Sequence, residues 1–165
     1  MTETTRTESV PQTVTVSLRV RGGAAALEYY AKAFGAVEDG ERMTLPDGRV
    51  GHAEMRIGNS KMMLGDEFPE YNTLGPQSIG GSSVTIALEV PDVDAVVERA
   101  VAGGGKLELP PADQFYGYRV GRVFDPFGHL WMVMTKIEEV TPEEMRRREA
   151  AWSAENAPPQ PAASS

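Results

Sequence analysis

The 165-residue sequence contains no cysteine, and this absence excludes several kinds of chemistry at once. A disulfide framework, a thiolate nucleophile, a thiolate zinc site and a cysteine-ligated iron–sulfur cluster all need that side chain. Histidine is scarce as well, because His52 and His129 are the only two. Any metal ion would therefore need ligands drawn from these imidazoles, from carboxylates and from neutral oxygens.

Positive charge is also in short supply. Sixteen Lys and Arg residues oppose 24 Asp and Glu residues, so the net charge is −8. A protein that follows nucleic-acid phosphates needs a basic face, so we expect no nucleic-acid partner. No apolar run approaches the ~20 residues of a membrane span, and residues 1–12 lack the apolar stretch of a signal peptide. These absences predict a cytoplasmic protein without membrane contact.

The two ends of the chain are predicted to lie outside the folded domain, which spans residues 13–137. Residues 1–12 are polar and aperiodic, which is typical of a flexible lead-in. A capping box with proline at the first helical position, Thr141-Pro142-Glu143-Glu144, predicts a helix within residues 138–156. Its three consecutive arginines are expected to pair with nearby glutamates; a nucleic-acid contact is the less favoured alternative. Residues 157–165, rich in Pro, Ala and Ser, are predicted to be a disordered tail.

Several stretches of the sequence recur at one constant spacing, the spacing that separates Arg49 from Arg119, which indicates an internal repeat. The alternative, coincidence among common residues, is less favoured because the stretches share that spacing. The repeat predicts two related modules, over about residues 13–66 and 83–137, joined by a connector at 67–82. The corresponding segments are Arg49-Val50-Gly51 and Arg119-Val120-Gly121, Ile57-Gly58 and Phe127-Gly128, Met62 and Met132, and residues 16–20 and 86–90.

Each module shows the same order of periodicities. An alternating apolar strand comes first, an amphipathic helix that ends at glycine follows, and two further strands come last. Room remains for one more short strand near residues 38–44. One helix can cover only one face of a module's sheet, so the other face must line a cleft or meet the sister module. The predicted strands cover residues 14–20, 52–57, 61–64, 84–90, 120–124 and 130–134, and the helices cover 27–34 and 93–101.

A paired module with the turn motif Asp125-Pro126-Phe127-Gly128-His129 before its last strand resembles the vicinal oxygen chelate superfamily. That group includes glyoxalase I, bleomycin-resistance proteins and extradiol dioxygenases. The sequence segments at residues 52–58, 66–69, 113–117 and 141–145 resemble those of its PhnB-like branch. The resemblance implies an α+β fold, in which two βαβββ modules form a curved mixed sheet around a cleft. It also implies a homodimer.

The resemblance identifies the positions at which a metal site would lie. Glyoxalase-type members take one ligand from the first strand and one from the last strand of each module. In this chain those positions fall at Thr15, Met62, Thr85 and Met132. Hydroxyl and thioether groups are poor ligands for a divalent ion that prefers carboxylate or imidazole. We therefore predict no metal and no cofactor, and we expect neither glyoxalase I activity nor extradiol ring cleavage.

His52 and Glu54 form the candidate catalytic pair. They lie two residues apart on one predicted strand, so both side chains point the same way. A histidine titrates near neutrality and can act as a general base that the carboxylate orients. The alternative is structural: Glu54 pairs with Arg56 or Arg122, and His52 lies at the rim of the cleft.

Candidate ligand-binding residues lie on the strand faces turned away from the helices and on the loop before the closing strand. Aromatic and methionine side chains offer adaptable apolar contact, and amide and phenol groups add polar contact. Phe115 and Tyr116 could instead plug one end of a barrel. The candidates are Thr15, Ser17, Met62, Thr85, Arg122, Phe124 and Met132 on strands, and Gln114, Phe115, Tyr116 and Tyr118 on or beside the loop.

These features favour a protein that binds a small polar or cationic metabolite or antibiotic in a metal-independent cleft. The alternative is a lyase, isomerase or hydrolase that acts on a small oxygenated metabolite through His52 and Glu54, with or without a non-standard divalent metal. A third hypothesis, an interaction module that docks a partner through its C-terminal helix, has only that helix in its favour.

Overall fold

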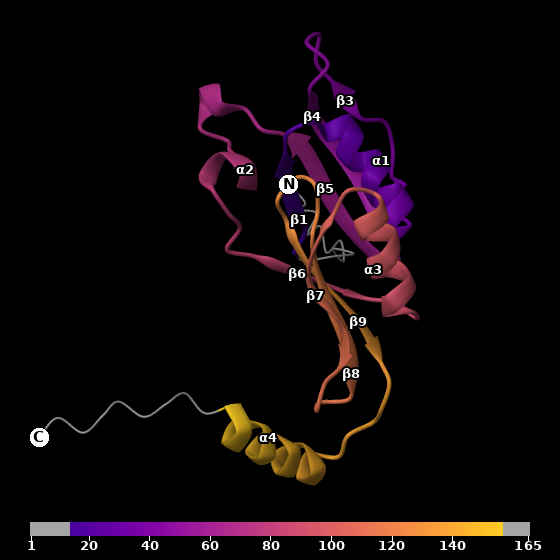
Figure 1. The fold of residues 1–165 in the computed structure, drawn as a ribbon. Coiled ribbons are helices and arrows are strands. Elements are labelled where there is room, and N and C mark those ends of the chain that lie inside the picture. Colours follow the sequence, from indigo (N-terminus) through magenta and orange to yellow (C-terminus); the bar gives the residue numbers. More distant parts are fainter. Residues whose placement is uncertain (1–13, 157–165) are drawn as a thin grey trace, which may run out of the picture. The chain divides into compact units, whose positions relative to one another are not determined.

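The computed structural model describes residues 14–156 as two units, each built on one mixed sheet (Figure 1). The first unit runs to Ser82 and includes Pro126–Gly128, and the second comprises Ser83–Asp125 and the residues from His129 onward. Two mixed sheets, each with its own helix, confirm the predicted α+β class. The lead-in and tail expected at residues 1–12 and 157–165 lie outside the described residues.

In the first unit the strand order is β1-β5-β4-β2, with β3 paired to β4. β1 and β5 are parallel and the other pairs are antiparallel. Helix α1 contacts β1, β4 and β5, and it buries an aromatic and aliphatic stripe that includes Leu27, Tyr30 and Phe34. It ends at Gly35, whose φ of 70° is a left-handed conformation that favours glycine. The elements are β1 (Val16–Val20), α1 (Gly23–Phe34), β2 (Val37–Glu38), β3 (Met43–Thr44), β4 (Val50–Ile57), β5 (Ser60–Asp66), a 3-10 turn η1 (Pro69–Tyr71) and α2 (Pro76–Ile79).

The second unit repeats this plan with the order β6-β9-β8-β7. β6 and β9 are parallel, and β7, β8 and β9 are antiparallel neighbours. Asp92 caps helix α3 by accepting a hydrogen bond from the Ala95 N–H at 3.0 Å. The helix buries a valine stripe, and Trp131 and Val133 of β9 are fully buried too. The elements are β6 (Thr85–Glu89), α3 (Val93–Ala102), β7 (Lys106–Asp113), β8 (Tyr118–Phe124), β9 (Leu130–Lys136) and α4 (Pro142–Asn156).

The Asp125–His129 motif forms the turn between β8 and β9. The Asp125 carboxylate accepts hydrogen bonds from the His129 N–H at 2.9 Å and from the Trp131 indole N–H at 2.8 Å. Gly128 has a φ of 92°, which a side chain would strain. Phe127, at the tip, packs on Tyr29 and Tyr30 within the first unit. The motif is therefore a structural turn, with its aspartate buried and hydrogen-bonded.

The two units are related, but not by one constant spacing along the chain. Val16 lies opposite Met62, whereas Ile86, the repeat counterpart of Val16, lies opposite Trp131 rather than Met132. Met55 pairs with Met62, and the residue that pairs with Trp131 is Val123. A constant spacing would have paired Asp125 with Met132, whose observed partner on β8 is Arg122. The predicted spacing therefore holds for the first strands and is wrong for the later ones.

None of the helices within residues 14–156 is long and apolar enough to cross a membrane.

Candidate functional site

Each sheet has one face covered by its helix, and we call the opposite face the open face. In the first unit the open face is mostly polar. Residues paired across strands share a face, so Ser17, Met63 and Glu54 lie side by side, as do Arg56 and Lys61. Strand alternation places His52 on the same face, and Thr15, half-buried, lies just before β1.

Met62 does not lie on this open face. It is only 6% exposed and pairs with Val16 and Met55 on the side covered by α1. The prediction that Met62 binds ligand, or stands at a metal position, is therefore wrong. Met63 occupies the open-face position instead, because a shift of one residue turns a strand side chain to the opposite face.

The candidate catalytic pair lies together, but Glu54 has a different main partner. His52 Nε2 is 3.6 Å from Glu54 Oε1, which is beyond hydrogen-bond distance. Glu54 forms an ion pair with Lys61, a partner that neither sequence hypothesis named. The Lys61 ammonium, more than the neighbouring His52 ring, lowers the pKa of Glu54. A carboxylate that is already ion-paired is better suited to orient His52 than to transfer a proton. Catalysis by His52 and Glu54 stays a prediction.

The open face of the second unit is apolar and aromatic by comparison. Along β9, Leu130, Met132 and Met134 face this side, and each pairs with residues of both flanking strands. Met132, for example, lies between Ala87 of β6 and Arg122 of β8. The face brings together five residues predicted from the sequence, namely Thr85, Tyr118, Arg122, Phe124 and Met132, and adds Glu89, Val120, Leu130 and Met134.

Arg122 is the central polar group of this face. Its Nε lies 3.0 Å from the Glu108 carboxylate, which supplies a counter-charge from β7. The Nε–H is nevertheless not directed at that oxygen, and within residues 14–156 no acceptor forms a hydrogen bond with this buried nitrogen. A buried donor without an acceptor is costly unless something else supplies one. Arg122 therefore has one donor that is ion-paired with Glu108 but is not aligned for a hydrogen bond with it.

The β7–β8 turn carries the remaining predicted residues. The Gln114 side chain donates to the Ala112 carbonyl at 3.2 Å, so its amide is engaged within the turn. The rings of Phe115 and Tyr116 meet edge to face at 5.2 Å, and Tyr116 lies 6.2 Å from Tyr118. An aromatic row thus extends from the turn onto the open face of β8.

Helix α4 contacts that turn through two side chains. Trp152 lies 5.7 Å from the Phe115 ring, and Arg148 donates to the Phe115 carbonyl at 3.2 Å. Arg148 also pairs with Glu138 at 2.7 Å. Contacts with α4 therefore account for the position of Phe115 in the turn, and no ligand is needed to explain it.

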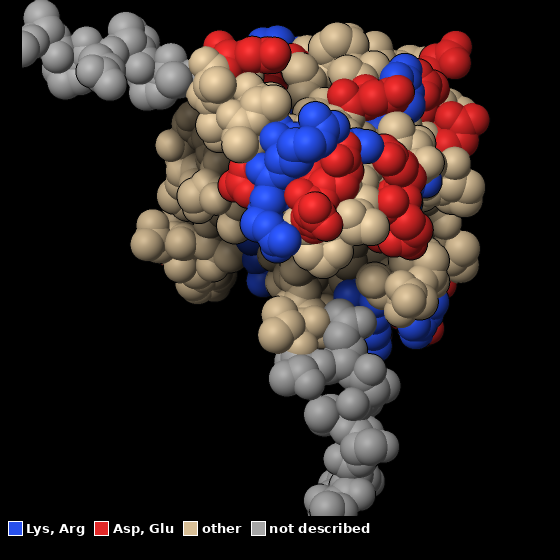
Figure 2. Space-filling view, turned by 90° about the horizontal axis from the view of Figure 1, so that it is seen from below, with Lys and Arg blue, Asp and Glu red and all other residues tan. Residues whose placement is uncertain are grey.

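Two of the three arginines of α4 are matched by acidic neighbours. Arg147 and Arg148 both pair with Glu144. Figure 2 views the molecule from below, and there basic side chains lie directly beside acidic ones. This interspersed pattern favours internal ion pairs over a phosphate-binding surface, which needs a continuous basic patch.

Two buried carboxylates, Asp66 and Glu67, accept hydrogen bonds that hold the first unit together, a role that the sequence did not indicate. Asp66 accepts hydrogen bonds from the N–H groups of Gly22, Gly23 and Val50 at 2.7, 3.0 and 2.7 Å. It therefore caps α1, whose own N-cap residue is a glycine without a capping side chain. In the sequence, this capping role is marked only by two adjacent acidic residues after a predicted strand. Such pairs are commonly exposed to solvent, so they do not indicate a buried cap.

Glu67 anchors the connector that follows β5. It accepts from the Ser78 hydroxyl at 2.6 Å and from the Gly75 N–H at 3.0 Å, and it pairs with Arg21 at 2.5 Å. These donors lower the pKa of Glu67 to about 2, Ser78 contributing most.

The Glu67 anchor predicts a specific loss of stability in acid. Because the folded-state pKa is depressed, the stabilisation is complete above the unfolded pKa of about 4.3 and disappears as pH falls toward about 2. The difference in Tm between wild type and Glu67→Gln should therefore be constant near neutrality and shrink over that acidic range. Thermal unfolding at a series of pH values measures it. A pH-independent difference in Tm for Glu67→Gln would contradict the assignment.

The residues at the positions that the family resemblance assigns to a metal site do not fit a divalent ion. In the observed register, the open-face neighbours of Thr15 are Lys61 and Met63. The open-face neighbours of Thr85 are Leu130 and Met132. Ammonium, thioether and alkyl groups are not ligands for hard or borderline divalent ions. Within residues 14–156, no three His, Asp or Glu side chains lie close enough together to hold a metal.

Comparison with known proteins gives the family. Residues 12–133 match the model of the Glyoxalase/Bleomycin resistance protein/Dioxygenase superfamily. The protein Mb0911c of Mycobacterium bovis is 42% identical over 132 residues, covering 78% of this chain and 86% of the relative. The crystal structure of At5g48480 from Arabidopsis thaliana superposes with a TM-score of 0.57 at 26% identity, covering 74% of this chain and 97% of that one. The PhnB protein from Bacillus cereus shares the fold, with a TM-score of 0.58 at 20% identity over 75% of this chain and 99% of its own.

The family match spans both sheets and ends within β9, before helix α4. The paired units, their parallel outer strands and the Asp125 turn all lie inside it. The chain therefore belongs to the Glyoxalase/Bleomycin resistance protein/Dioxygenase superfamily.

Proposed function

We propose that this protein is a PhnB-like member of its superfamily that binds a small polar metabolite or antibiotic on the open face of its second sheet, without a metal ion. The observation that carries the proposal is Arg122, whose buried Nε–H has no acceptor within the described residues. Phe124, Met132 and Tyr118 share its face and offer apolar and aromatic contact. A ligand with a flat or apolar body and a hydrogen-bond acceptor satisfies both features.

The charges of this face refine the chemistry of the ligand. A carbonyl, carboxylate or phosphonate oxygen is the natural acceptor for a guanidinium N–H. Glu89 lies on β6, which β9 separates from β8, and it can receive a hydroxyl or cationic group of the same molecule. Glu54 gives little support to a cationic ligand, because Lys61 already pairs with it.

The donor set supports metal independence. Binding through Arg122 and the aromatic row needs no Lewis acid, and the superfamily's metal positions hold side chains unsuited to a divalent ion. We therefore expect binding to survive chelation. One tightly held divalent ion per chain in the purified protein would contradict this part of the proposal.

Methyl spectra of protein labelled at methionine would test the proposal directly. The probes are phenylpyruvate, phenylphosphonate and metal-free bleomycin, each titrated in the presence of EDTA. We expect at least one to shift the Met132 and Met134 methyl signals saturably. Arg122→Gln should weaken binding of the acidic probes about tenfold through loss of a charge-assisted hydrogen bond.

Arg119→Gln is the matched control, because Arg119 lies on the same strand but pairs with Asp94 of α3 on the opposite face. It should leave the dissociation constant unchanged. Shifts confined to other methionines, equal losses in both variants, or no saturable shift with any probe would each refute the proposed site or its ligand classes.

A homodimer and a cytoplasmic location belong to the same proposal. The family resemblance supports the first, and a cysteine-free composition is compatible with a reducing compartment. Sedimentation of the purified protein measures the oligomeric state.

A further inference from the structure

Arg122 and Glu108 form an ion pair in which neither side chain satisfies the other's hydrogen-bonding groups. Arg122 Nε lies 3.0 Å from Glu108 Oε2, yet no hydrogen bond joins the two side chains within residues 14–156. Both side chains are partly exposed, at 37% and 36%, so a small molecule can reach the guanidinium and the carboxylate. The open face of the second unit therefore presents a donor and an anionic acceptor next to each other.

A bulge in the edge strand β7 sets the position of Glu108. Leu107 lies opposite Val123, and Leu109 lies opposite Arg122. Two residues of β7 therefore face one residue of β8, and Glu108 is the extra one. Bulges redirect side chains and are common beside functional sites. Two consecutive prolines follow, and their fixed φ limits movement of the strand. The backbone, rather than a hydrogen bond to Arg122, therefore places Glu108.

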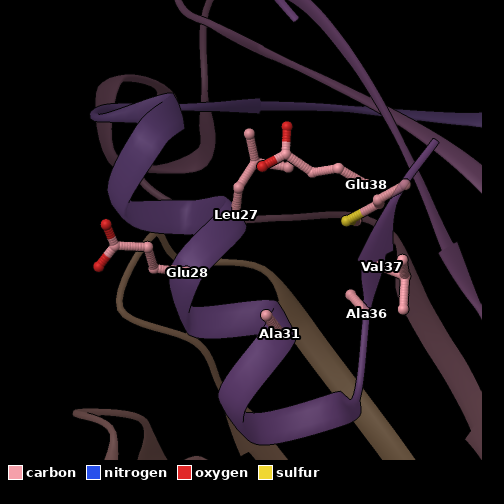
Figure 3. A pocket seen from close by; sticks show the side chains of 7 residues that line it. Leu27, Glu28, Ala31, Ala36, Val37 and Glu38 are labelled. Carbon is pink, nitrogen blue, oxygen red and sulfur yellow. The ribbon is translucent and has the colours of Figure 1, made fainter. Parts of the chain in front are cut away.

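The Glu38–Arg42 pair of the first unit has the complementary geometry. Glu38 lines a recess between helix α1 and strand β2 (Figure 3). One of its carboxylate oxygens accepts a hydrogen bond from Arg42 Nε at 3.0 Å, and the other accepts one from Arg42 Nη2. Both oxygens of Glu38 are thus already engaged. Glu108 differs, because its ion pair with Arg122 contains no such hydrogen bond.

The charges of the second unit's open face disfavour an added anion. Glu108 already offsets the charge of Arg122, and Glu89 adds a second carboxylate on β6. Lys136, at the end of β9, is itself paired with Glu139. A carboxylate ligand would bring another negative charge beside Glu108 and would have no proton to donate to it. A neutral group that has both an acceptor and a donor avoids both costs.

We propose that the Arg122–Glu108 pair selects ligands whose hydrogen-bond acceptor and donor lie side by side, as in a primary carboxamide or a lactam. The ligand carbonyl accepts a hydrogen bond from the Arg122 guanidinium, and the ligand N–H donates to the Glu108 carboxylate. Phe124 and Met132, on the same face, contact the apolar body of the ligand. This inference rests on the binding function proposed above and names the ligand class of that site, with Glu108 as the residue that determines specificity.

Three probes of one shape separate these contributions. Phenylacetamide has the donor and the acceptor, phenylacetone has the acceptor alone, and phenylacetate has the acceptor with a negative charge. Each is titrated at neutral pH, with EDTA, into the full-length protein labelled at methionine methyls. We expect phenylacetamide to shift the Met132 and Met134 signals saturably. Phenylacetone should bind about twofold to tenfold more weakly, the effect of one hydrogen bond. Phenylacetate should bind about fivefold or more weakly than the amide, because repulsion by Glu108 adds to that loss.

Two variants assign the preference to Glu108. Glu108→Gln keeps the shape of the side chain and removes its charge, so it should bind phenylacetate about threefold or more tightly than wild type does. The preference for the amide over the acid should shrink or reverse. Glu98→Gln removes the same charge from an exposed position on α3, the helix that covers the opposite face. It should leave the ratio of the two dissociation constants unchanged.

The outcomes distinguish this inference from the binding function on which it rests. Phenylacetate binding as tightly as phenylacetamide to wild type, or equal changes of the ratio in both variants, would overturn the role of Glu108 and leave the open-face site in place. The same conclusion would follow if phenylphosphonate shifted the Met132 signal while phenylacetamide did not. No saturable shift with any probe would overturn the binding function, and this inference with it.

Discussion

Replacing Asp66 by alanine is expected to lower the free energy of unfolding by about 3 kcal/mol. The substitution leaves the N–H groups of Gly22, Gly23 and Val50 without their acceptor, and the carboxylate that they share is 5% exposed. Buried donors that lose a partner cannot recover it from water, so the desolvation penalty remains. Urea unfolding followed by circular dichroism measures the loss, and hydrogen exchange at the start of α1 should accelerate.

Asp92→Ala provides the matched control for Asp66. Asp92 is also an aspartate that caps a helix, but it accepts one hydrogen bond at an exposed site. Its replacement should cost about 1 kcal/mol, the usual value for an N-cap. Losses of equal size at the two positions would show that the buried network around Asp66 adds nothing beyond an ordinary cap.

Gly117→Ala should destabilise the second unit by about 2–3 kcal/mol and release helix α4. Gly117 has a φ of 85°, and an added Cβ would lie 2.6 Å from the Glu138 carbonyl oxygen and 2.8 Å from Val140. The Gly117 carbonyl also accepts the N–H groups of Ile137 and Glu138, so this residue holds the segment that leads into α4. The two indole N–H signals in an amide spectrum report the result: the Trp152 signal should move toward its value in unfolded protein.

Gly58→Ala separates backbone strain from collision. Gly58 has a φ of 57°, but nothing lies within 4 Å of the position its Cβ would take. Alanine there should cost only the conformational penalty, about 1 kcal/mol, and the Trp152 signal should stay in place. A Gly117→Ala protein with the same stability as Gly58→Ala and an unmoved Trp152 signal would disprove the proposed contact with residues 138–140.

Much of the fold was predictable because local patterns decide it. Alternating apolar residues predicted β1 and β6, and the Asp92 cap and valine stripe predicted α3. Strand β7 gave no such pattern, since it contains Pro110 and Pro111. Proline lacks a backbone donor, so it is tolerated only where one side of a strand is unpaired, and β7 lies at the sheet edge.

The candidate site was predictable in part. Alternation correctly placed Arg122, Phe124 and Met132 on one face of the second sheet. It did not indicate that Lys61 pairs with Glu54, because that contact joins neighbouring strands whose register depends on the turn between them. The capping of α1 by Asp66, 44 residues from Gly22, likewise has no local signal.

The sequence by itself determined the α+β class, the paired modules and the Asp125 turn, because each depends on residue type and short-range spacing. Only the tertiary structure decided which methionine faces the first unit's open face. The hairpin between β4 and β5 closes with residues 58–59 between Ile57 and Ser60, whereas residues 126–128 lie between the hydrogen-bonded Asp125 and His129. That one extra residue shifts the register of the last strand relative to the first repeat. Since side chains alternate along a strand, equal sequence spacing does not preserve the face. Met132 lies on the open face of its sheet, whereas Met62 lies in the core and Met63 takes the open-face position.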